Sequence, residues 1–133
     1  MKASNNRSGQ ALVEFALVIS VFCLILVGIV DVGRMLYTKH MLDKATREGA
    51  RAGVVISNVD LAKSTSLSIA QSILGQLNLS PGPSVQASIV TVNGVDAVRV
   101  SANYVFTSTF SSTHFPIIPS VNLTSNSTMR KEG

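Results

Sequence analysis

A long run of uncharged, mostly apolar residues constrains this chain more than any other feature. Residues 15–30 read FALVISVFCLILVGIV and contain no charged side chain. As an α-helix rising 1.5 Å per residue, this run spans about 24 Å, whereas the hydrocarbon core of a bilayer is about 30 Å thick. Extending the helix back to Gln10 lengthens it to about 31 Å. The sequence therefore predicts a membrane-spanning helix over residues 10–30.

A cleaved secretory signal peptide is the alternative interpretation of this run. Such a peptide also has a basic start and an apolar core, but a small-residue cleavage site should follow the core closely. The residues that follow, DVGRMLY at 31–37, offer no such site, and the ARA at 50–52 lies too far downstream. We therefore expect the segment to remain in the protein as an anchor.

The charge of the chain is concentrated around the apolar run. The formal net charge is +4, and basic residues flank the run on both sides, whereas residues 54–133 are close to neutral. A nucleic-acid-binding surface would need a clustered basic patch with aromatic partners, so this distribution argues against nucleic acid as a partner. Because lysines and arginines occur on both sides, the positive-inside rule does not by itself orient the helix.

Glu14 lies inside the predicted membrane boundary. An ionisable group there is costly and is a functional hypothesis by default; the plain alternative is that Glu14 sits at the membrane interface. No lysine or arginine lies within one helical turn of it, but Gln10 lies four residues earlier. A cut between Gly9 and Gln10 would give Gln10 an α-ammonium group. That group could pair with Glu14 at the i, i+4 spacing, or Glu14 could pair with the amine of a neighbouring subunit.

This arrangement resembles the class III signal of type IV pilin-like proteins. Gly9 is followed by Gln10, and Glu14 and Phe15 would be the fifth and sixth residues of a chain cut after Gly9. Three linked segments are similar to the TadE/TadG-like family of minor pilins or pseudopilins of tight-adherence (Flp) pilus systems. They are GQALVEFALV at 9–18, DVGRMLY at 31–37 and ATREGARAG at 45–53.

The resemblance implies a location and a set of partners. Residues 1–9 would be a leader removed by a prepilin peptidase on the cytoplasmic side of the bacterial inner membrane. Glu14, with Phe15 beside it, would act in assembly with other pilin or pseudopilin subunits and the assembly platform. The N-terminus would face the cytoplasm and residues 54–133 the periplasm or exterior, with the protein either staying at the base of the fibre or entering it.

The helix is expected to continue beyond the membrane through residues 31–53, which contain no proline. Residues 10–53 would then form a helix about 66 Å long. Three pairs of opposite charge lie three or four residues apart on this extension and should face one another: Asp31 with Arg34, Asp43 with Arg47, and Glu48 with Arg51.

Three small residues share one face of the extension, namely Ala45, Gly49 and Gly53. Glycine costs a helix about 1 kcal/mol relative to alanine, whereas small residues at spacing four allow another backbone to approach closely. We expect this face either to contact a neighbouring helix or the sheet of the same chain, or, for the glycines, simply to end the helix as a C-cap.

Residues 54–133 predict a small α+β domain. A helix is expected over 61–77 with Asp60 as its N-cap. VQASIVTV at 85–92 reads as a strand, Asn93-Gly94 as a hairpin turn, and 98–106 as the alternating return strand. FPIIP at 115–119 interrupts regular structure, and 121–129 predicts a last strand. The fold class is therefore α+β: a long N-terminal helix, a short helix and three or four antiparallel strands.

The sequence contains no pattern that supports catalysis or cofactor binding. His40 and His114 are the only histidines, and Cys23 is the only cysteine, so neither a disulfide within the chain nor a cysteine metal cluster is expected. We predict no catalytic residues, no metal, no cofactor and no small-molecule substrate. Besides the pilin-like role, an uncleaved, signal-anchored binding module with no role in a fibre remains open.

Overall fold

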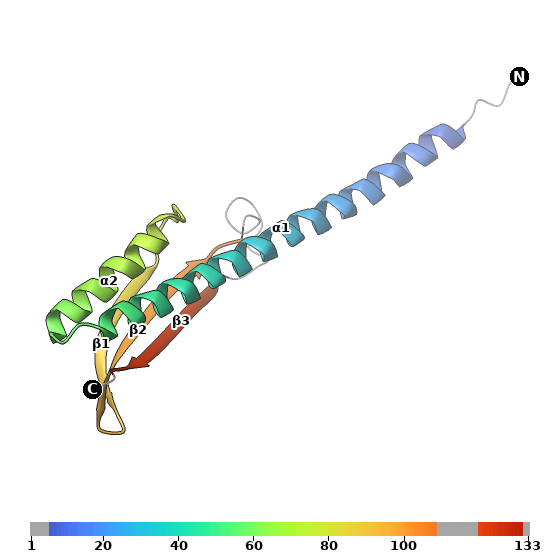
Figure 1. Ribbon diagram of the computed structural model, residues 1–133. Helices are drawn as coiled ribbons and strands as arrows, with labels where there is room; N and C mark the ends of the chain where they lie inside the picture. The colour runs from blue at the N-terminus through green and yellow to red at the C-terminus, as the bar shows by residue number, and fades with distance from the viewer. Residues whose placement is uncertain (1–5, 109–119, 132–133) are drawn as a thin grey trace, which may run out of the picture. The chain divides into compact units, whose positions relative to one another are not determined.

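The computed structural model describes residues 6–108 and 120–131 and has an α+β fold (Figure 1). Helix α1 runs from Asn6 to Val54 and helix α2 from Val59 to Gly75. Three strands follow, β1 over Ser84–Val92, β2 over Val95–Phe106 and β3 over Val121–Arg130. The chain divides into two compact units, Met1–Arg34 and Met35–Gly133. The predicted α+β class is therefore confirmed.

Helix α1 has the uninterrupted helical structure that the sequence predicts. Its N-terminal part falls in the first unit and contains an eighteen-residue window of mean hydropathy 2.8, none of which is buried. Residues 35–54 fall in the second unit, where every third or fourth side chain becomes buried, including Leu42, Ala45 and Ala50. Because 3.6 residues complete one turn, these buried positions define one helix face.

Helix α2 begins earlier than predicted, and Asp60 is not its N-cap. The cap is Asn58, whose side-chain oxygen accepts hydrogen bonds from the backbone N–H groups of Asp60 and Leu61 at 3.0 and 3.3 Å. Asp60 instead lies in the first turn, where a negative charge is favourable near the helix N-terminus. The buried face of the helix consists of Ala62, Ser66, Ala70 and Leu74.

The three strands form one antiparallel sheet in the order β1-β2-β3. The predicted hairpin is confirmed, since Asn93 and Gly94 both have positive φ, 52° and 78°, as a two-residue type I′ turn requires. The turn sets the register, which pairs Val92 with Val95 and Val85 with Ala102. Strand β3 pairs with the other edge of β2, with Ala102 opposite Ser125. The FPIIP stretch at 115–119 lies outside the described residues.

The core of the second unit lies between one face of this sheet and the two helices. Strand β2 alternates as predicted, with its buried side chains facing the helices: Val98, Val100, Ala102, Tyr104 and Phe106. Helix α2 packs against β1 and β2, and residues 39–53 of α1 approach α2, β2 and β3. The opposite face of the sheet carries polar residues such as Ser88, Arg99 and Thr128, as expected for an antiparallel sheet covered on one side.

Candidate functional site: the apolar helix and its packing surface

The N-terminal part of α1 exposes an apolar surface all round the helix. Leu12, Phe15, Leu17 and Val18 are each between 63 and 69% exposed, and the same character continues to Val30. Exposed apolar surface of this extent marks a membrane or protein contact. By length and composition the helix is able to cross a membrane, so this surface requires a lipid or protein environment.

Gly9, Gln10 and Glu14 lie together on this helix. They line one shallow surface hollow with Val13 and Leu17, because positions 10, 13, 14 and 17 share a helix face. Glu14 is exposed, and it makes no hydrogen bond or ion pair with another described residue. Phe15 lies beside it and is 65% exposed. The Glu14 carboxylate is therefore accessible to a hydrogen-bond donor or a positive charge that lies outside the described residues.

The polar groups that follow the apolar run are more constrained. Arg34 Nη1 lies 3.5 Å from Asp31 Oδ1, so the predicted pair of residues 31 and 34 is confirmed. Asp31 is only 8% exposed. Within the apolar run itself, the hydroxyl of Ser20 donates to the carbonyl oxygen of Ala16 at 2.7 Å. That bond satisfies the serine inside its own helix.

Ala45, Gly49 and Gly53 lie on the face of α1 that packs inside the second unit, and all three are buried. A Cβ added at Gly49 would lie 2.8 Å from the carbonyl oxygen of Ser66 and 3.3 Å from the Cβ of Ala70. A Cβ at Gly53 would overlap the hydroxyl oxygen of Ser66 and come within 3.0 Å of Val98. The two glycines therefore permit α1 to approach α2 and β2 at distances that no larger residue allows.

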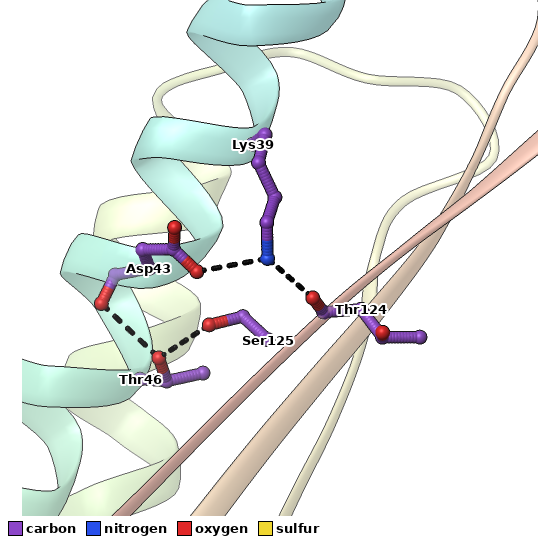
Figure 2. A network of polar contacts seen from close by, with 5 residues as sticks. All are labelled: Lys39, Asp43, Thr46, Thr124 and Ser125. Carbon is purple, nitrogen blue, oxygen red and sulfur yellow. Dashed lines mark hydrogen bonds and ion pairs between the residues drawn. The ribbon is translucent and has the colours of Figure 1, made fainter.

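A polar network joins α1 to β3 on the flank of this packed face (Figure 2). The ammonium group of Lys39 donates to Asp43 Oδ1 at 3.0 Å and to the carbonyl oxygen of Thr124. Thr46 Oγ1 donates to the carbonyl oxygen of Asp43 and lies 2.9 Å from Ser125 Oγ. Thr46 and Ser125 are 1 and 5% exposed, so each buried hydroxyl is satisfied by the other element.

The partner predicted for Asp43 was wrong. Asp43 pairs with Lys39, and in the described parts of the chain neither the Asp43–Arg47 nor the Glu48–Arg51 pair comes within ion-pair distance. Lys39 and Arg47 are both four residues from Asp43, so helix geometry alone does not choose between them. Asp43 pairs with Lys39 because the Lys39 ammonium group also donates a hydrogen bond to the Thr124 carbonyl oxygen on β3.

The environment of Asp43 lowers its pKa below the ordinary value of 3.8. Partial burial acts in the opposite direction and raises the pKa, since it disfavours the charged form. The neighbouring Ser125 hydroxyl, the hydrogen bond and charge of Lys39, and the charge of Arg47 together outweigh that effect. Asp43 is therefore held ionised beside the helix–sheet contact.

The titratable residues do not assemble a reactive centre in the part of the chain that is described. No group of three or more histidine, cysteine, aspartate or glutamate side chains there could hold a metal ion. His40 is exposed on α1 and Cys23 is exposed on the apolar segment. His114 lies outside the described residues.

The described chain thus combines an exposed apolar helix, long enough to cross a membrane, with a small α+β unit. Residues 9–51 match the family described as TadE-like protein. Over this segment the chain is similar to that family. Comparisons with curated proteins and with solved structures gave no match.

Proposed function

We propose that this protein is a minor pilin or pseudopilin of a Tad-type adhesion pilus, inserted in the inner membrane and trimmed after Gly9 by a prepilin peptidase. Residues 10–30 would anchor the mature chain, with its N-terminus in the cytoplasm. Residues 31–53 would continue the helix outside the membrane, and 54–133 would form the periplasmic or extracellular domain. The family match over residues 9–51 supports a role in the pilus system.

The observation that carries the proposal is the carboxylate of Glu14 on an exposed apolar helix, on the same face as Gln10. Inside a membrane an unpaired carboxylate is costly. Proteolysis after Gly9 supplies an ammonium group at position 10, either on the same chain or on a neighbouring subunit. The ion pair would then form only after processing, so trimming would couple directly to assembly.

The proposal is tested first by the intact mass and N-terminal sequence of the protein isolated from its native membrane. A mature chain that begins at Gln10 is expected. A chain that still begins at Met1, or lacks only that methionine, would favour an uncleaved, signal-anchored binding module with no role in a fibre. An N-terminal pyroglutamate, recognised by its mass, would remove the amine from the proposed ion pair but leave the processing step intact.

Gly9 can be tested against a matched glycine on the same helix. Neither Gly9 nor Gly28 has any atom within 4 Å of an added Cβ, so valine is sterically accommodated at both positions. Gly9→Val is expected to block trimming, so that the longer chain remains in the membrane. Gly28→Val is expected to be trimmed normally, so that its mature mass, after correction for the substitution, is that of a chain beginning at Gln10. Normal trimming of the Gly9→Val chain would contradict the assigned cleavage site.

The assembly role of Glu14 has a matched control in Ser20. Glu14→Ala should leave insertion intact or improve it, because a costly charge is removed, and should reduce the amount of assembled pilus. Ser20→Ala also removes a polar group from the apolar segment, but that group is satisfied within its own helix. We expect Ser20→Ala to assemble normally. Normal assembly by Glu14→Ala would refute the ion pair.

A further inference from the structure

Four basic or imidazole side chains form a stripe on the free face of α1. They are His40, Lys44, Arg47 and Arg51, which follow one another at steps of four, three and four residues and are all exposed. At 3.6 residues per turn these positions lie within about 60° of one another around the helix axis. The buried residues Leu42, Ala45 and Ala50 lie on the packed face, on the other side of the same helix.

No ion pair within the described residues uses the basic stripe, although the charge of Arg47 acts on the nearby Asp43 carboxylate. The ion pairs found there join Arg34 to Asp31 and Lys39 to Asp43, and neither uses Lys44, Arg47 or Arg51. Three permanent positive charges therefore follow one another over about 10 Å of helix. Like charges at spacings of three and four residues weaken a helix, so helix stability does not explain why these three charges are clustered.

We propose that the basic stripe is a docking surface for an acidic helix face on a different pilin-type subunit. Arginine presents a planar fork of donors that matches a carboxylate in two parallel hydrogen bonds. Arg47 and Arg51 lie four residues apart, which matches carboxylates three or four apart on a facing helix. The proposal rests on the proposed function, since it requires that the chain meets other pilus subunits.

Exposed apolar residues next to the stripe fit a protein contact. Leu36 and Tyr37 are 60 and 59% exposed just before His40, and Val55 is 82% exposed just after Arg51. Arginine and tyrosine are enriched in protein–protein interfaces, and charge at the rim steers association. The stripe thus combines electrostatic selection with apolar contact area at both of its ends.

A second copy of this chain does not supply the complementary surface. The exposed carboxylates of the described second unit are scattered, with Glu48 on α1, Asp60 on α2 and Asp96 on β2. Asp43 is already paired with Lys39. No row of carboxylates at helical spacing is formed by these residues, so the partner is a different chain.

A lipid surface also fits less well than a protein partner. A helix that lies on a membrane inserts an apolar face between the headgroups. In residues 40–51 the apolar face is occupied by contacts with α2 and the sheet. Within residues 40–51 a lipid contact would therefore depend on charge alone.

The partner can be identified by photo-crosslinking in cells that assemble the pilus. A photoreactive amino acid in place of His40 in the full-length chain leaves Lys44, Arg47 and Arg51 intact, and the same probe in place of Ser88 on the outer sheet face is the control. After irradiation, mass spectrometry identifies the adduct and the crosslinked residue. We expect a pilin-type subunit, crosslinked beside at least two carboxylates three or four residues apart on a helix.

Charge reversal tests whether the contact is electrostatic. Arg47→Glu with Arg51→Glu should lower the yield of the His40-site adduct by roughly tenfold, which corresponds to about 1.4 kcal/mol, and lysines in place of the partner's mapped carboxylates should restore it. The neutral pair Arg47→Gln and Arg51→Gln should give a smaller loss without placing acids near the helix C-terminus. Arg99→Glu, the same charge change on the outer sheet face, should have no effect.

Several outcomes would overturn the proposal. In the crosslinking experiment, these are an adduct with phospholipid alone, with a second copy of this chain or with a protein surface that lacks carboxylates. In the charge-reversal experiment, it is an adduct yield that the Arg47→Glu, Arg51→Glu pair leaves unchanged. Pilus assembly separates this failure from that of the proposed function. If the stripe variants assemble normally and Glu14→Ala does not, the docking surface is wrong and the pilin role stands. If all of them assemble normally, the docking surface and the Glu14 ion pair are both wrong, and a chain that is also untrimmed would refute the pilin role.

Discussion

Gly49→Ala tests whether position 49 requires glycine because α1 and α2 approach each other closely there. Helix propensity alone predicts that alanine stabilises an α-helix by about 1 kcal/mol over glycine. The structure predicts the opposite sign. The new Cβ would lie 2.8 Å from the backbone carbonyl oxygen of Ser66, about 0.6 Å inside the 3.4 Å at which ordinary contact begins.

The size of the loss follows from which atom must move. A backbone carbonyl cannot rotate away as a flexible side chain can, so α1 and α2 must separate. The new Cβ would also lie 3.3 Å from the Cβ of Ala70, which is tight as well. Overpacking of a tight core costs about 1–3 kcal/mol, and a backbone clash places this site in the upper part of that range. After the gain in helix propensity, a net loss of about 1–2 kcal/mol in the free energy of unfolding remains.

The loss can be measured by thermal unfolding of the full chain in detergent micelles. The chain has no tryptophan, but Tyr104 is 8% exposed in the core, so near-ultraviolet circular dichroism reports the second unit. For a unit of this size the midpoint should fall by roughly 4–8 °C for each kcal/mol. Gly75→Ala, which meets no atom within 4 Å, is the control and should not lower the midpoint. A rise in the midpoint of the Gly49→Ala chain would refute the reasoning.

Three further perturbations test other parts of the domain by the same unfolding assay. Thr46→Val should cost about 0.5–1.5 kcal/mol because it removes the buried contact between the Thr46 and Ser125 hydroxyls. The loss in the double variant with Ser125→Ala should be smaller than the sum of the two single losses; strictly additive losses would argue against the contact. Asp43→Asn should reduce stability at pH 7. Because the pKa of Asp43 is lowered on folding, its contribution to stability is present above pH 3.8 and is lost as the pH falls through the lower folded value. The two chains should therefore have similar stability in acid, and a difference that is constant with pH would contradict this. Gly94→Ala forces a residue with a Cβ into φ +78° and should cost about 1–2 kcal/mol, and an unchanged midpoint would show that the type I′ turn is not required.

Patterns confined to neighbouring residues were sufficient for much of the fold. The alternation of β2 predicted that Val98, Val100, Ala102, Tyr104 and Phe106 share its buried face, and Asn93-Gly94 predicted the hairpin turn. Helix ends were less well predicted, since Asn58 rather than Asp60 caps α2. Both residue types are good N-caps, so the position of the first turn depends on how α2 packs, which the local sequence does not contain.

Some features of the candidate site could likewise be predicted from local sequence, and others could not. The relation of Gly9, Gln10 and Glu14 follows from helical spacing, and so their common face could be predicted from the sequence. The choice of Lys39 as the partner of Asp43 could not, because it depends on the Thr124 carbonyl, which lies 85 positions away along the chain. The basic stripe was also missed, although its steps of four, three and four residues are visible in the sequence once that helix face is known to be free.

The apolar helix, the carboxylate of Glu14 within it and the strands of the sheet could all be read from the sequence, because each depends on hydrophobicity and on periods of two or 3.6 residues. Tertiary structure decided what the small residues of α1 are for. Gly49 and Gly53 could have ended a helix or met another subunit, and only the approach of Ser66 and Val98 assigns them to packing within the chain. Steric contact between segments far apart in sequence depends on three-dimensional distance, and no local pattern encodes it.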